Sequence, residues 1–93
     1  MPAQAATVVR IPASAASVIL QLANRGRKGL LIYNDSTNTL FVKFGSGASV
    51  VDWTVKLATG DYFEAPQFPI YVGVVTGIWD GTNGVAEVTE MYG

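Results

Sequence analysis

The chain of 93 residues contains neither cysteine nor histidine. Without cysteine it can form no disulfide bridge and no thiolate metal site. The lack of both residue types excludes a Ser-His-Asp triad, a Cys-His nucleophile–base pair and a zinc site built from these side chains. We therefore predict a protein that is not an enzyme and that carries no cofactor.

Charge is also scarce, since charged residues make up 14% of the chain and the formal net charge is −1. Nucleic-acid-binding domains are usually strongly basic, so we expect no nucleic-acid partner. No apolar run approaches the ~18 residues that a membrane-spanning helix needs. Val18-Ile19-Leu20 is too short for the core of a signal peptide. We expect synthesis in the cytoplasm and no contact with a membrane.

Hydrophobic residues, in contrast, account for 49% of the chain. An average soluble domain carries about 25% charged residues, so this chain has an unusual surplus of apolar groups. One small core cannot hide them all, which indicates a homo-oligomer, such as a trimer, or a part of a larger assembly. The alternative is a monomer with an ordinary patchy surface.

Two runs of strand-forming residues, Gly29–Asn34 and Thr39–Phe44, flank the polar segment Asp35–Asn38. This pattern predicts a β-hairpin. In Val50–Leu57 apolar residues alternate with polar ones, which predicts a strand with one buried face.

Further strands are predicted at Thr7–Ile11, Val18–Leu22, Tyr62–Ala65, Ile70–Thr76, Gly77–Trp79 and Val85–Tyr92. Of these, Ile70–Thr76 and Gly77–Trp79 could be one strand with a kink at Gly77. Seven or eight short strands without an amphipathic helix predict one all-β domain over residues 1–93. We expect a small antiparallel β-sandwich, jelly-roll- or immunoglobulin-like, with a small barrel as the alternative. Residues 1–11 are predicted to be a flexible arm or an edge strand, the arm covering Met1–Ala6. The predicted core consists of Ile32, Leu40, Val42, Phe44, Val51, Trp53, Val55, Leu57 and Val88, while Trp79 belongs to the core or to an interface.

Other segments favour structural roles over binding. The turn Asp80–Gly84 is rich in residues that tolerate positive φ, but it lacks the alternating acidic ligands of a calcium loop. The glycine-rich segment Gly45–Gly47 is followed by no Lys-Ser/Thr pair, so a flexible connection is favoured over a phosphate site. No cofactor or metal ligand is assigned.

Strand alternation also predicts a contact surface. If Ile32 and Leu40 point inward in paired strands, their neighbours point outward and form an apolar strip on the hairpin. The basic turn before the hairpin supplies polar rim contacts to an acidic partner, or is simply a solvated turn. The predicted partner-contact residues are Arg25, Arg27, Lys28, Leu31, Tyr33, Phe41 and Lys43.

Several segments resemble a pattern found in small structural proteins of tailed bacteriophages. The resemblance covers about residues 24–90. It rests on Arg27–Gly29, Ile32–Thr37, Leu40–Gly45, Asp61–Pro66, Gly77–Trp79 and Gly84–Glu90.

The resemblance implies a capsid decoration, or cement, protein that clamps neighbouring copies of the phage major capsid protein. Its location would be the capsid surface of the virion, after synthesis in the bacterial host. A protein of the head–tail joint or the tail is the second expectation. A small carbohydrate-binding module that uses Trp79 and the tyrosines is a third.

Overall fold

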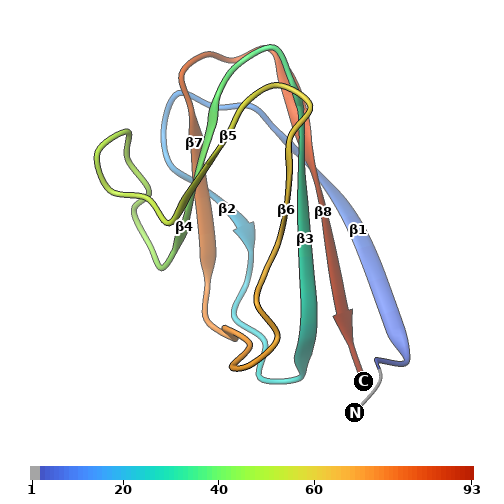
Figure 1. Ribbon diagram of the computed structural model, residues 1–93. Helices are drawn as coiled ribbons and strands as arrows, with labels where there is room; N and C mark the ends of the chain where they lie inside the picture. Colours follow the sequence, from blue (N-terminus) through green and yellow to red (C-terminus); the bar gives the residue numbers. More distant parts are fainter. Residues whose placement is uncertain (1–2) are drawn as a thin grey trace.

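The computed structural model describes residues 3–93 as two four-stranded antiparallel sheets packed face to face (Figure 1). The described residues contain no helix, and so none that could cross a membrane. The strands are β1 (Ala5–Pro12), β2 (Val18–Gln21), β3 (Arg27–Ser36), β4 (Leu40–Phe44), β5 (Val55–Leu57), β6 (Tyr62–Glu64), β7 (Val75–Trp79) and β8 (Gly84–Tyr92). The prediction of an all-β sandwich is confirmed.

The order of strands is β1-β8-β3-β6 in one sheet and β2-β7-β4-β5 in the other. The first strand pairs with the eighth, the second with the seventh, the third with the sixth and the fourth with the fifth. A long hairpin with its turn between β4 and β5, rolled so that alternate pairs enter opposite sheets, gives this arrangement. It is the topology of an eight-stranded jelly roll.

The core lies between the sheets and is made from alternate residues of each strand. Five of the predicted core residues are buried, and two others, Phe44 and Val55, are partly buried and pack against them. Trp79 is 1% exposed and lies in the same core. The five buried residues are Ile32, Leu40, Val42, Leu57 and Val88.

The prediction of a hairpin between Gly29–Asn34 and Thr39–Phe44 is wrong, because β3 and β4 lie in different sheets. The intervening segment carries the chain across the sandwich. Its polar groups stabilise this crossing: the Asn34 side-chain amide and the Ser36 hydroxyl both donate to the Asn38 carbonyl. Short-range sequence cannot distinguish this crossing from a hairpin turn, since both need polar residues between two strands.

The prediction of a strand over Val50–Leu57 is also wrong for its first half. Only β5 is a strand, and a tight turn closed by Ser49 and Asp52 precedes it. Val51 is 89% exposed and Trp53 is 41% exposed, so neither belongs to the core. We attribute the absence of a strand over residues 50–54 to the segment before them, in which Gly45 and Gly47 have positive φ.

These glycines start a loop that folds over the outer face of the β2-β7-β4-β5 sheet. The backbone N–H of Ala48 donates to the Thr76 hydroxyl, which in turn donates to the Gly45 carbonyl. Thr76 is therefore buried although it points away from the core. The alternation in residues 51–57 arises partly from this loop, and only its second half is a pleated strand.

The starts of two predicted strands also differ from those in the structure. Residues from Ala5 onward form edge strand β1, so the edge-strand alternative is confirmed and the predicted arm is wrong for Ala5 and Ala6. Met1 and Pro2, the start of that arm, lie outside the described residues. The segment before β7, predicted as strand from Ile70, is irregular, and β7 continues through Gly77 without interruption.

Candidate interaction surfaces

The predicted apolar strip does not exist as one surface. Leu31 and Tyr33 lie on the outer face of the β1-β8-β3-β6 sheet. Phe41 and Lys43 lie on the outer face of the other sheet, on the opposite side of the molecule. The outward orientation follows from strand alternation, but the shared face required a β3–β4 pairing that the fold lacks.

The prediction that Arg27 contacts a partner is also wrong. Its side chain is buried, and its Nε donates to Glu90 Oε2 at 2.8 Å. The register between β3 and β8 shifts between Arg27 and Gly29. This irregularity turns the Arg27 side chain into the sandwich. An arginine in this position cannot supply a rim contact to a partner.

Each nitrogen of the Arg27 guanidinium and each oxygen of the Glu90 carboxylate takes part in at least one hydrogen bond. The Arg27 guanidinium donates to the carbonyls of Tyr71 and Gly73 through Nη1, and to that of Leu22 through Nη2. Gln21 donates to the second carboxylate oxygen of Glu90 at 2.8 Å. These bonds attach the irregular segment before β7 and the residue after β2 to β3, and they attach the end of β2 to β8. The role of Arg27 is therefore structural.

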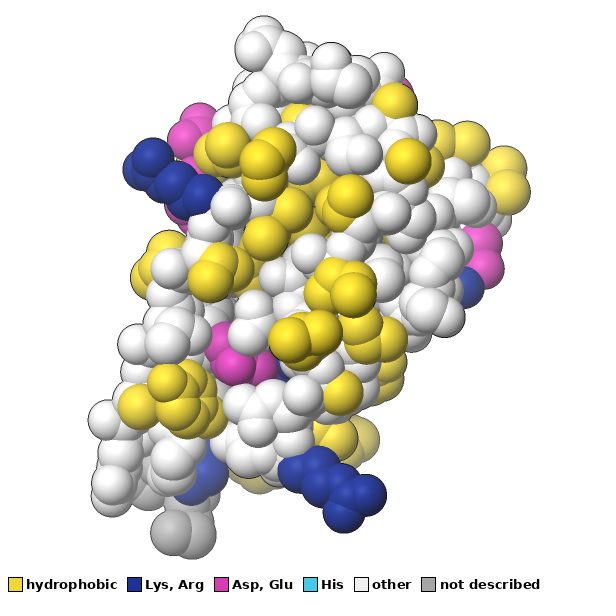
Figure 2. Space-filling model, turned by 180° about the vertical axis from the view of Figure 1, so that it is seen from behind, with side chains coloured by type: hydrophobic (Ala, Val, Ile, Leu, Met, Phe, Trp, Pro, Cys, Tyr) yellow, Lys and Arg dark blue, Asp and Glu magenta, His cyan; other side chains and the backbone are white. Residues whose placement is uncertain are grey.

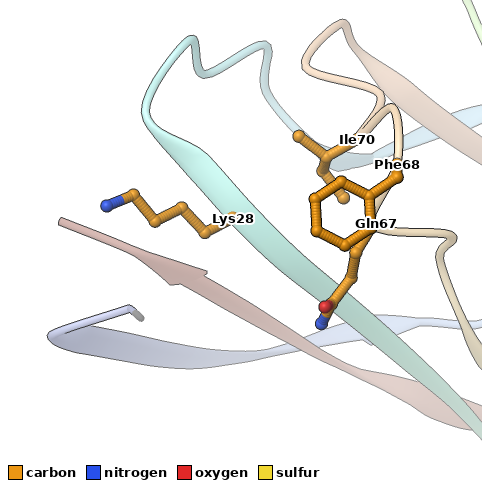
Figure 3. A pocket seen from close by; sticks show the side chains of 4 residues that line it. All are labelled: Lys28, Gln67, Phe68 and Ile70. Atoms are coloured by element: carbon orange, nitrogen blue, oxygen red, sulfur yellow. The ribbon is translucent and has the colours of Figure 1, made fainter. Parts of the chain in front are cut away.

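Arg25 and Lys28, the other members of the basic turn, remain near the surface. The Lys28 ammonium donates to the backbone carbonyl of Gly93 at 2.8 Å. Figure 3 shows it pointing away from Gln67, Phe68 and Ile70, the other residues of a shallow pocket. The pocket encloses about 140 Å³, which is below the roughly 300 Å³ of the smallest typical ligand sites.

An aromatic cluster on the β2-β7-β4-β5 sheet is the most distinctive exposed feature. The rings of Phe41 and Trp53 are 5.9 Å apart between centroids, and the Lys56 ammonium lies 6.0 Å from the Trp53 ring. Lys43 pairs with Asp52 at 2.6 Å beside them. We call these five residues the Trp53 platform.

Sequence reasoning found Phe41 and Lys43 of this platform but missed Trp53, which it placed in the core. The available signal was the glycine-serine loop directly before residues 50–54. A loop of that flexibility makes a continuous strand over the next residues less favourable.

The opposite outer face, on the β1-β8-β3-β6 sheet, mixes apolar and charged groups. Exposed Val8, Tyr33 and Tyr62 share it with the carboxylate of Glu87. Burial and the nearby Asp35 carboxylate raise the pKa of Glu87 above its usual value, while Arg10 acts in the opposite direction. One Glu87 oxygen is buried without a hydrogen-bond partner, and its closest cation, Arg10, is 3.7 Å away.

Seen from behind, the molecule shows hydrophobic side chains in several separate groups, with most charged side chains towards the outline (Figure 2). Across residues 3–93 no three acidic side chains come together as a metal site would need. Comparison of the chain with family models, curated proteins and solved structures finds no match.

Proposed function

We propose that this chain is a non-catalytic structural protein of a tailed-phage virion, most specifically a capsid decoration protein. It would bind the outside of the shell and contact neighbouring major capsid subunits. The observation that carries the proposal is the Trp53 platform, an aromatic surface that an isolated domain leaves exposed to water. The segment similarities at residues 24–90 supply the phage context.

The platform has the composition of a protein–protein contact. Tryptophan is a frequent energetic centre of such contacts, and Trp53 lies in a loop over the sheet, with its ring against that of Phe41 in β4. Lys43 and Lys56 supply a polar rim that suits an acidic capsid surface. The jelly-roll topology is compatible, since viral capsid domains and lectins both use it, although a fold alone does not determine function.

A second placement, at the head–tail joint or in the tail, uses the same platform against a different virion protein. The carbohydrate-binding alternative can no longer rest on Trp79. Trp79 is buried and cannot contact a sugar, so Trp53 would have to provide the aromatic surface.

The test uses phage particles that lack the protein. Purified parent chain and the Trp53→Ala variant are added to separate samples, and the bound copies are counted after sedimentation. We expect the parent to bind tailless heads and Trp53→Ala to bind at least about tenfold fewer copies, the loss typical of an interface centre.

Phe68→Ala is the matched control, because Phe68 is 93% exposed and lies outside the platform. It should bind like the parent. Binding to tails and not to heads would support the second placement. Saturable binding to oligosaccharides, lost in Trp53→Ala, would instead support the carbohydrate module. Equal binding by Trp53→Ala and the parent would refute the role of the platform.

A further inference from the structure

The two sheets have four edge strands, and β1 differs from the other three. Strands β5 and β6 have three residues each, and β2 has four residues with a register irregularity. Strand β1 has eight residues and pairs with β8 without any irregularity. Natural sheets protect their edges with short strands, bulges and charges, so β1 is the unprotected edge of this sandwich.

The direction of the free hydrogen-bonding groups on β1 follows from its register. The backbone N–H of Ala13 donates to the Gly84 carbonyl, which makes this a hydrogen-bonded pair. Such pairs alternate along an antiparallel ladder, so the backbone N–H and C=O groups of the odd-numbered residues of β1 point towards β8. The N–H and C=O groups of Ala6, Val8 and Arg10 therefore point away from the sheet. Pro12, at the next even position, has no N–H to offer.

The surroundings of these groups are open and apolar. Figure 1 shows β1 as the outermost ribbon of its sheet, with no other segment on its free side. Val8 is 63% exposed, and Val9 is also exposed. The single charge on the strand, Arg10, lies beside Glu87 of β8. Nothing among residues 3–93 covers this edge.

We propose that β1 pairs antiparallel with β1 of a second copy of this chain, about a twofold axis that passes beside Val8. In this register Val8 lies opposite Val8 of the second copy, and Ala6 lies opposite Arg10 in both directions. Each of the three outward-facing residues then makes both of its backbone hydrogen bonds. The two sheets join into one continuous eight-stranded sheet, a size that open sheets commonly reach.

The choice of a second copy rests on the self-complementarity of the edge. The register centred on Val8 uses every outward N–H from Ala6 to Arg10 and keeps the two Arg10 positions about 13 Å apart along the strand. A shift of the axis towards Pro12 would bring the arginines together and include a residue that cannot donate. An isologous contact of this kind closes as a dimer and does not extend into fibres.

This proposal does not depend on the virion function, because the purified chain tests it. Sedimentation velocity is measured over a wide range of protein concentration, and we expect the mass to rise from 9.9 kDa towards twice that value. Val8→Pro removes the central outward N–H without touching the bonds to β8, and proline is tolerated at such positions of edge strands. This variant should keep its circular dichroism spectrum and remain a monomer. Val8→Ala, the matched control that retains the N–H, should still dimerise.

Amide hydrogen exchange tests the register directly. With rising concentration, the amides of Ala6, Val8 and Arg10 should gain protection, whereas those of Thr7 and Val9 are already protected by β8. If Val8→Pro does not fold, Val8→Lys replaces it, since it places two cations opposite each other at the axis. A mass that stays at 9.9 kDa would overturn the proposal. A dimer in which the three outward amides exchange as fast as in the monomer would overturn it too.

Discussion

The two tryptophans of this chain occupy opposite environments. Trp79 lies in β7 between the sheets, and its indole Nε1–H donates to Asn34 Oδ1 at 3.3 Å. Trp53 lies in the loop over the outer face, where its indole Nε1–H donates to the Val50 carbonyl. Both indoles have a hydrogen-bond partner, but only Trp79 is enclosed by other side chains. Because only one of the two indoles is buried, we expect Trp79 to stabilise the fold more than Trp53 does.

The same contrast separates two glutamates on β8. Glu90 faces inward and both of its carboxylate oxygens accept hydrogen bonds, from Arg27 and from Gln21. Glu87 faces outward and has one buried oxygen without a partner. The polar groups of the interior are therefore better satisfied than those of this part of the surface.

Substitution of Trp79 should give the largest loss of stability. Trp79→Ala empties a large buried site and also removes the hydrogen bond that the indole N–H donates to the side-chain oxygen Oδ1 of Asn34. We expect a loss of about 3–5 kcal/mol in the free energy of unfolding. Urea denaturation followed by circular dichroism measures it, and a loss below about 1 kcal/mol would contradict the placement of Trp79 in the core.

Arg27→Met should come next, with a loss of about 3 kcal/mol, because it leaves the Glu90 carboxylate buried without its cation. The double variant Arg27→Met with Glu90→Leu removes both charges and should recover part of the stability. Denaturation of the parent, both single variants and the double variant measures the coupling. Additive losses would show that the two side chains act independently.

Trp53→Ala should lose less than about 1 kcal/mol, because the indole is partly in solvent and its removal opens no internal cavity. Fluorescence sharpens this comparison: in Trp79→Phe the remaining indole should be readily quenched by acrylamide, and in Trp53→Phe it should be protected. Equal quenching in the two variants would contradict the assignment of one tryptophan to the interior.

Glu87→Gln should have the smallest effect, a gain of no more than a few degrees in Tm at pH 7. The raised pKa of Glu87 means that its ionisation is less favourable in the folded than in the unfolded chain. The stability associated with the neutral carboxyl is present below the unfolded pKa of about 4.3 and is lost as pH rises through the folded pKa. Calorimetry should therefore find the gain at pH 7 and none below about pH 4. If the gain in Tm persists below about pH 4, the ionisation of Glu87 is not its cause.

Local sequence predicted most of the strands because a pleated strand with one buried face needs period-2 alternation. It placed β8 within one residue at its start and β4 within one residue at its start. It failed where alternation had another origin, as in Val51–Trp53, whose apolar side chains lie on an outward-facing loop. Trp79, in contrast, lies on a strand whose neighbours are mostly apolar, and its burial could be anticipated.

The candidate surface was less predictable, because it depends on which strands are neighbours. The outward orientation of Tyr33 and Phe41 follows from each strand alone. Their separation onto opposite faces depends on the pairing of β3 with β8, whose residues lie about fifty positions further along the chain. The burial of Arg27 likewise needs Glu90, which no local pattern connects to it.

The sequence by itself therefore determined the class of this protein. Its apolar and polar residues alternate in short runs, turn residues separate the runs, and no segment has helical periodicity. It also determined the chemistry that is impossible without cysteine and histidine. Only the tertiary structure decided which strands pair, which tryptophan is enclosed, where Arg27 finds its carboxylate and which edge remains open. These are contacts between residues far apart in the chain, and their free energy depends on the whole packed arrangement and not on any local segment.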